Sequence, residues 1–74
     1  MPRRVFTAAI HREADRYVAL CPEVDIASQG ETIETARENL REVVGLFLQT
    51  ASPQEMAERL HDEVYLSALE VTIG

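Results

Sequence analysis

The chain has 74 residues, of which 13 are acidic and seven basic, so its formal net charge is -6. A chain of this length has room for one domain with a small core, so we assign residues 1–74 to a single domain and expect it to form a homo-oligomer. The acidic excess repels a phosphate backbone, which argues against direct nucleic-acid binding, and it attracts basic proteins.

Cysteine content and hydropathy indicate the compartment. Cys21 is the only cysteine, so no intrachain disulfide can form, which is typical of the reducing cytoplasm. No segment approaches the roughly 18 apolar residues of a membrane span, and the N-terminal residues lack the apolar core of a secretion signal. We therefore expect a cytoplasmic protein without a membrane partner. All seven basic residues are Arg, which is compatible with a GC-rich genome or a thermophilic bacterial host.

Period-two alternation predicts three strands in the first part of the chain. The first is expected over residues 4–11, RVFTAAIH, and the second over residues 16–21, RYVALC, after a short polar turn. Pro22 removes a backbone donor, so strand pairing should lapse there. A third strand is expected over residues 24–28, VDIAS, and the meander ends at Gly30.

The apolar spacing then changes to that of helices. An apolar stripe from Ile33 onward predicts an amphipathic helix of about four turns with Thr32 as its N-cap. A second, short helix is expected to run to about His61, with Ser52 as its cap, Pro53 at its first position and Glu55 three residues after the cap, as in a capping box.

The last segment, EVYLSALEVTI over residues 63–73, returns to period two and is apolar on both sides. Such a strand needs cover on both faces, and a second copy of the chain is one source of that cover. A right-handed crossover through the helix would place it parallel to the first strand, in the order 3-2-1-4. The predicted fold class is α+β: a two-layer βββαβ domain with a mainly antiparallel sheet covered by one long helix.

The stretch SQGETIETA places a turn glycine before a helix start, as in many phosphate sites. Its two glutamates bring full negative charges to the helix N-terminus, which outweigh the partial positive charge of the helix dipole. We therefore assign Ser28, Gly30 and Thr32 to a structural turn and cap.

No side chains show the spacing of a catalytic or metal site. Four carboxylates lie near turns: Glu13, Asp15, Glu23 and Asp25. A metal-dependent nuclease needs carboxylates that converge from separate elements. His11 and His61 have no partner at a ligand spacing, and nothing in the sequence marks an activating base for Cys21. We predict no enzyme activity, no metal and no cofactor.

The run YVALCPEVDIASQGETIETARENLREVVGLFL resembles the HicB antitoxin family of bacterial and archaeal type II toxin-antitoxin systems. The shared pattern is an aromatic-led strand, a proline near its end, S-x-G-x-T and an E-N-L-type helix, over roughly residues 5–48. The matching positions are Tyr17, Pro22, Ser28, Gly30, Thr32, Glu34, Ala36, Asn39 and Leu40. The chain departs from the pattern at Thr35, where the family often has Glu.

The resemblance implies a partly degraded RNase H-like fold without its nuclease carboxylates. It implies a non-catalytic domain that sequesters a small basic HicA-type toxin, which cleaves RNA. Family members usually continue into a DNA-binding domain, which we do not expect after Gly74, so the resemblance does not extend to autorepression. Charge and expected exposure select Tyr17, Glu23 and Asp25 as partner-binding residues. The alternative is a stand-alone structural or small-ligand-binding homo-oligomeric module without a toxin partner.

Overall fold

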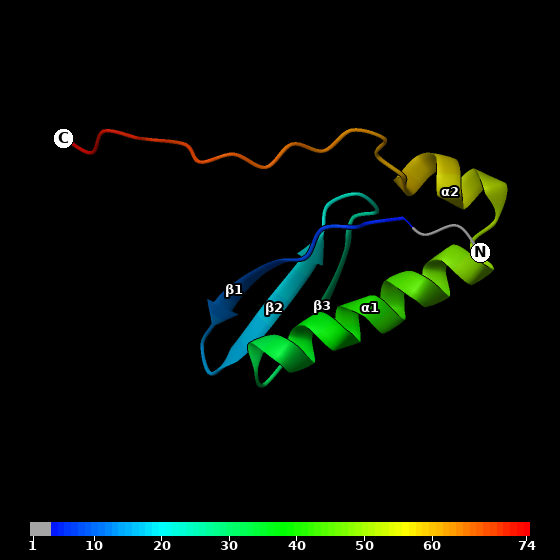
Figure 1. Ribbon diagram of the computed structural model, residues 1–74, viewed down its shortest axis with the longest axis horizontal. Helices are drawn as coiled ribbons and strands as arrows, with labels where there is room; N and C mark the ends of the chain where they lie inside the picture. The colour runs from blue at the N-terminus through cyan, green and yellow to red at the C-terminus, as the bar shows by residue number, and fades with distance from the viewer. Residues whose placement is uncertain (1–3) are drawn as a thin grey trace.

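The structure is a computed structural model that describes residues 4–74. Residues 1–3, which belong to the predicted single domain, lie outside the described residues. Figure 1 shows the elements in chain order: β1 (Ala9–Glu13), β2 (Arg16–Cys21), β3 (Ile26–Gly30), α1 (Ile33–Thr50) and α2 (Pro53–Arg59). The strands form one antiparallel sheet in the order β1-β2-β3, so the α+β class is confirmed.

The second strand lies where the sequence predicts it, but its neighbours are displaced along the chain. Residues 4–8 are extended without being part of β1, because Pro22 has no N–H to continue the ladder opposite them. The turn after β2 is closed by a 2.9 Å hydrogen bond from the Asp25 N–H to the Cys21 carbonyl, and Asp25 has a φ of 60°. This turn directs Val24 into the core, so β3 begins only at Ile26.

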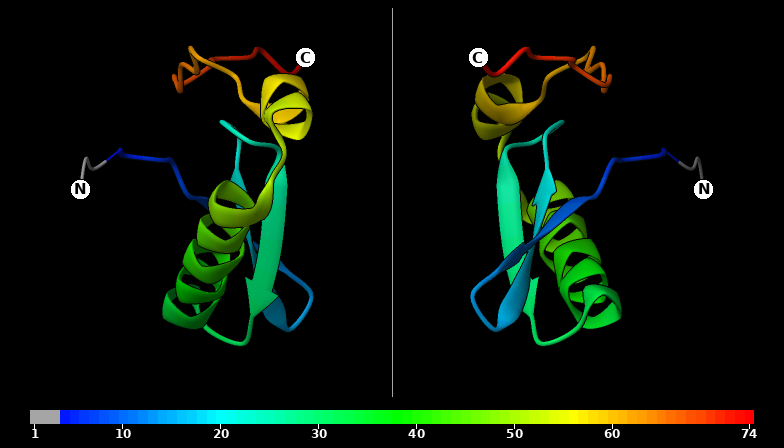
Figure 2. Two further views of the ribbon diagram at one scale, coloured as in Figure 1. Left: turned by 90° about the vertical axis from the view of Figure 1, so that its right-hand side faces the viewer. Right: turned by 90° about the vertical axis from the view of Figure 1, so that its left-hand side faces the viewer.

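Helix α1 covers one face of the sheet, and among residues 4–74 no helix covers the other face (Figure 2). The buried core joins the two layers and consists of Ala19, Cys21, Val24, Ala36, Leu40 and Val44. Thr32 caps the helix, since its hydroxyl accepts a 3.0 Å hydrogen bond from the Thr35 N–H. The helix has 18 residues, five turns rather than the expected four. Two residues of the predicted apolar stripe lie at its margin, Ile33 at 46% and Val43 at 41% exposure.

Helix α2 begins with a capping box. The Ser52 hydroxyl accepts from the Glu55 N–H, and the Glu55 carboxylate accepts from the Ser52 N–H, both at 3.1 Å. The helix ends at Arg59, two residues before the predicted end. Within residues 4–74, neither helix combines the length and hydropathy that crossing a bilayer requires.

The strand predicted over residues 63–73 is not formed within residues 4–74, so the sheet has the 3-2-1 part of the predicted order without a fourth strand. These residues are extended and pair with no strand of residues 4–74, and Figure 1 shows them running away from the sheet to a distant C-terminus. The physical reason is that β-strands form by pairing, so an alternating apolar pattern becomes a strand only where a sheet edge meets it.

Candidate functional site

Glu23 joins three segments of the chain. Its carboxylate accepts hydrogen bonds from the Thr7 N–H at 2.9 Å and the Thr7 hydroxyl at 2.6 Å, and a weaker one from the Cys21 thiol at 3.3 Å. Its carbonyl accepts a 2.7 Å hydrogen bond from the His61 N–H. Because the ladder between β1 and β2 stops at Pro22, the Thr7 N–H has no carbonyl partner on β2. The Glu23 carboxylate accepts its hydrogen bond instead. The sequence predicts that Glu23 binds a partner, but its carboxylate already accepts hydrogen bonds from within the chain.

These contacts shift two pKa values. Partial burial acts to raise the pKa of Glu23, but the hydrogen bonds that its carboxylate accepts, chiefly those from Thr7, outweigh burial and hold it below its ordinary value. Burial, followed by the hydrogen bond to Glu23, raises the pKa of Cys21. The Cys21 thiol is thus buried and protonated at neutral pH, which makes it a core residue rather than a nucleophile.

The other two predicted partner-binding residues lie apart from each other. Asp25 is exposed in the turn next to Glu23, and its carbonyl accepts a 3.0 Å hydrogen bond from Arg59 Nη1. Tyr17 lies half-buried against the core at the opposite end of β2, opposite Gly30. The length of the strand separates it from Cys21 by about 13 Å. The structure brings Glu23 and Asp25 together and leaves Tyr17 elsewhere.

Contacts between β3 and α1 hold the helix on the sheet. A Cβ at Gly30 would lie 2.5 Å from the Ala36 nitrogen, so only glycine permits this approach of helix and strand. Asn39 donates a 2.8 Å hydrogen bond from Nδ2 to the Gln29 carbonyl in β3. Ser28 lies half-buried in β3 opposite Ala19.

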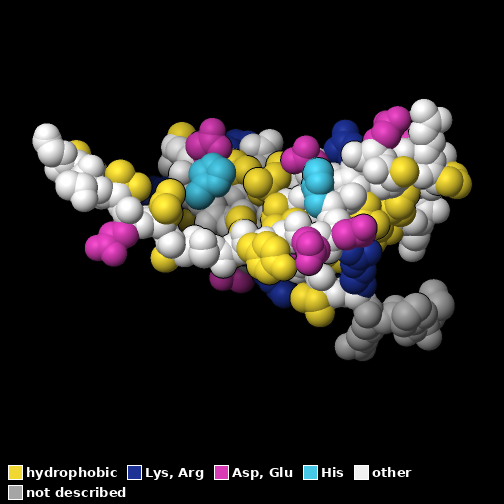
Figure 3. Space-filling model, turned by 90° about the horizontal axis from the view of Figure 1, so that it is seen from above, with side chains coloured by type: hydrophobic (Ala, Val, Ile, Leu, Met, Phe, Trp, Pro, Cys, Tyr) yellow, Lys and Arg dark blue, Asp and Glu magenta, His cyan; other side chains and the backbone are white. Residues whose placement is uncertain are grey.

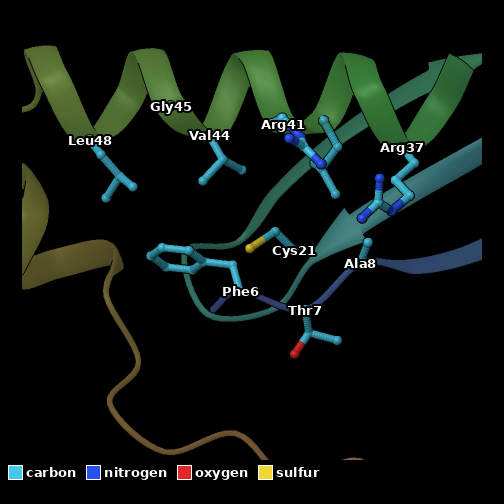
Figure 4. Close-up of a pocket in the computed structure, with 10 residues that line it drawn as sticks. Phe6, Thr7, Ala8, Cys21, Arg37, Arg41, Val44, Gly45 and Leu48 are labelled. Carbon is cyan, nitrogen blue, oxygen red and sulfur yellow. The ribbon is translucent and has the colours of Figure 1, made fainter. Parts of the chain in front are cut away.

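A groove that the sequence did not indicate lies beneath α1, beside residues 6–8, which lead into β1 (Figure 4). Its volume is about 270 Å³, and we call it the β1–α1 groove. Its apolar lining includes Phe6, Leu40, Val44 and Leu48, and Arg37 and Arg41 extend from α1 at one end. A Cβ at Gly45, which also lines the groove, would meet no atom within 4 Å. The groove exists because α1 lies mainly across β2 and β3 and leaves the β1 side less covered. That placement depends on tertiary packing and has no local sequence signal.

A second unpredicted feature is the C-terminal tail, residues 62–74. Figure 3 shows it extending from the body of the molecule with hydrophobic side chains along it. Five large apolar side chains on it are between 64% and 95% exposed: Tyr65, Leu66, Leu69, Val71 and Ile73. The sequence indicates their alternation but not that the domain leaves them uncovered.

In the part of the chain that the structure describes, no three His, Cys, Asp or Glu side chains are grouped as metal ligands would be. His11 Nε2 lies 3.1 Å from the exposed Glu13 carboxylate on the same strand. Comparison of the chain with protein-family models, with curated proteins and with solved structures found no match.

Proposed function

We propose that this chain is a HicB-like, non-catalytic protein-binding domain that sequesters a small basic toxin of the HicA type. The observation that carries a binding role is the acidic outer side of α1. Glu34, Glu38 and Glu42 follow one another at four-residue spacing and are all exposed. Residues at this spacing share one side of a helix, so three carboxylates face solvent together.

The arginines of α1 do not neutralise this side of the helix fully. Arg37 and Arg41 line the β1–α1 groove, and the only ion pair described between α1 side chains in residues 4–74 joins Arg41 Nε to Glu38 Oε2 at 3.6 Å. Both side chains of that pair are more than half exposed, so the pair screens the Glu38 charge only weakly. With a net charge of -6 for the whole chain, this surface favours a basic partner.

The resemblance to HicB antitoxins supplies the class of partner. Positions of the shared pattern lie at the junction of β3 and α1: Gly30 and Asn39 fix the helix on the strand, and Thr32 caps it. Three antiparallel strands followed by a covering helix are also the first four elements of the partly degraded RNase H-like fold that we propose. In that fold the C-terminal tail would supply the fourth strand.

Copurification from the native host at low salt tests the proposal. We expect recovery of a small protein rich in Lys or Arg, encoded by the adjacent reading frame, whose RNA cleavage stops when this chain is added. Recovery of the homo-oligomer alone would contradict the proposal and favour the stand-alone homo-oligomeric module.

Matched charge variants test the surface. Replacing Glu34, Glu38 and Glu42 by Gln should weaken toxin binding at least tenfold and reduce its dependence on salt. The control replaces three exposed glutamates elsewhere: Glu13, Glu58 and Glu63. Equal loss of binding in both triple variants would show that net charge, and not the α1 surface, attracts the partner.

A further inference from the structure

In residues 4–74 the sheet has two edges, and the edge at β1 borders the β1–α1 groove. Because the strand order is β1-β2-β3, β1 and β3 are both edge strands. At the β3 edge, Asn39 Nδ2 donates a hydrogen bond to the Gln29 carbonyl, and α1 packs closely against the strand. At β1, the Thr7 N–H points to Glu23 on the β2 side. By strand alternation, Ala8 and Ile10 present their backbone groups to the open edge. An open edge of this kind accepts an added strand.

The C-terminal tail has the pattern of such a strand. Between Val64 and Ile73 the side chains alternate on an extended backbone and are apolar on both sides. Glu70 is the only charged residue in that interval. It lies on the same side of the strand as Val64, Leu66 and Ala68. The tail thus has one face with apolar groups at its start and a carboxylate near its end.

The β1–α1 groove has the complementary arrangement. Val44, Leu48 and Phe6 lie at the end of the groove where the segment before β1 enters, and Arg37 lies toward the other end (Figure 4). A strand running parallel to β1 would place Val64 near Leu48. From Val64 to Glu70 such a strand advances about 20 Å, and α1 spans about 16 Å from Leu48 to Arg37. Glu70 would then meet Arg37, whereas an antiparallel strand would bury Glu70 beside Phe6.

The tail does not reach this edge within its own molecule. Arg59 and His61 are tied to the turn after β2 by hydrogen bonds to the Asp25 and Glu23 carbonyls. No glycine or proline lies between Pro53 and Gly74, so no residue there favours a chain reversal. The tail, whose 13 residues can span up to about 43 Å, runs away from the sheet, and the molecule is 47 Å long but only 28 by 21 Å across.

We infer that two copies of this chain exchange their C-terminal tails. The tail of each copy adds as a fourth strand, parallel to β1, at the β1 edge of its partner, with its Val64 side in the β1–α1 groove and Glu70 beside Arg37. A reciprocal exchange of this kind closes on itself as a twofold dimer and leaves no tail unpaired. The inference does not rest on the proposed toxin, because it involves this chain alone.

Light scattering after size exclusion tests the exchange with the full chain. We expect the wild type at 100 µM to have twice the 8.3 kDa chain mass. Glu70→Arg and Arg37→Glu should each raise the dimer dissociation constant at least tenfold, and the double variant should restore it to within about threefold of wild type. Glu31→Arg, which makes the same charge change as Glu70→Arg at an exposed position outside the groove, should leave the mass unchanged.

Three results would overturn the inference. A wild type that stays at 8.3 kDa would show that no exchange occurs, whether the tail is free or folded onto its own edge. A dimer that withstands Arg37→Glu would show that the tail binds elsewhere. Because Arg37 is an exposed helix residue, this substitution should leave the fold intact. A dimer that the double variant fails to restore would contradict the pairing of Glu70 with Arg37.

Discussion

Thr7 and Glu23, 16 residues apart in sequence, are joined by two hydrogen bonds, from the Thr7 N–H at 2.9 Å and from the Thr7 hydroxyl at 2.6 Å. This relationship holds the extended segment before β1 beside the end of β2, where Pro22 interrupts the ladder. It thereby keeps Phe6 in the wall of the β1–α1 groove.

Replacing Glu23 by Gln should therefore destabilise the fold. Gln retains one oxygen acceptor but loses the charge and the second acceptor, so one Thr7 donor is left without a partner, at a cost of about 1–3 kcal/mol. Urea unfolding measures the change. Glu31→Gln, at an exposed position without these contacts, is the control and should change the free energy of unfolding by less than about 0.5 kcal/mol.

The contribution of Glu23 should depend on pH. Its pKa is lowered in the folded chain, because the hydrogen bonds from Thr7 outweigh partial burial. Folding therefore gains stability from this group above its unfolded pKa of about 4.3, and the gain is lost as the pH falls through the lower folded pKa. We expect the stability difference between wild type and Glu23→Gln to be constant near pH 7 and to shrink below about pH 4. A difference that widened on acidification would contradict this sign.

Gly30 and Gly45 should respond to alanine in opposite directions. At Gly30 the added Cβ would lie 2.5 Å from the Ala36 nitrogen, so we expect a loss of about 1–3 kcal/mol or more. At Gly45, inside α1, the Cβ meets nothing within 4 Å, and replacing a helical glycine should add about 0.5–1 kcal/mol. Thermal and urea unfolding of the two variants measures both. Equal effects would mean that the close approach at Gly30 is relieved by a shift of α1.

Cys21 should resist thiol reagents in the folded protein. Its side chain is buried and its pKa is raised, chiefly by that burial, so little thiolate is present or accessible at pH 8. We expect reaction with a disulfide reagent to proceed at the rate of unfolding. In the Cys21→Ala background, Ser67→Cys on the exposed tail should react at least a hundredfold faster below the concentration at which the chain dimerises.

Much of the fold follows from local rules. The bounds of β2, the Thr32 cap and the capping box at Ser52 depend on residues within a few positions of one another, and for that reason the sequence indicates them. The displacement of β3 depends on the turn in which Asp25 has a positive φ, and no local pattern marks that choice.

The binding surfaces could not be predicted in the same way. The role of Glu23 depends on Thr7, a contact across two strands, and the β1–α1 groove depends on where α1 crosses the sheet. The alternation of residues 63–73 indicates a segment with strand character. It does not say with which edge the segment pairs, and within residues 4–74 the expected fourth strand is not formed.

Hydrogen exchange at the tail amides shows directly whether residues 63–73 become a strand only with another chain. The exchange should be measured on the full chain at concentrations above and below its dimer dissociation constant. We predict slow exchange of alternate tail amides above that concentration and fast exchange below it. Fast exchange at every concentration, or protection that does not depend on concentration, would contradict the account.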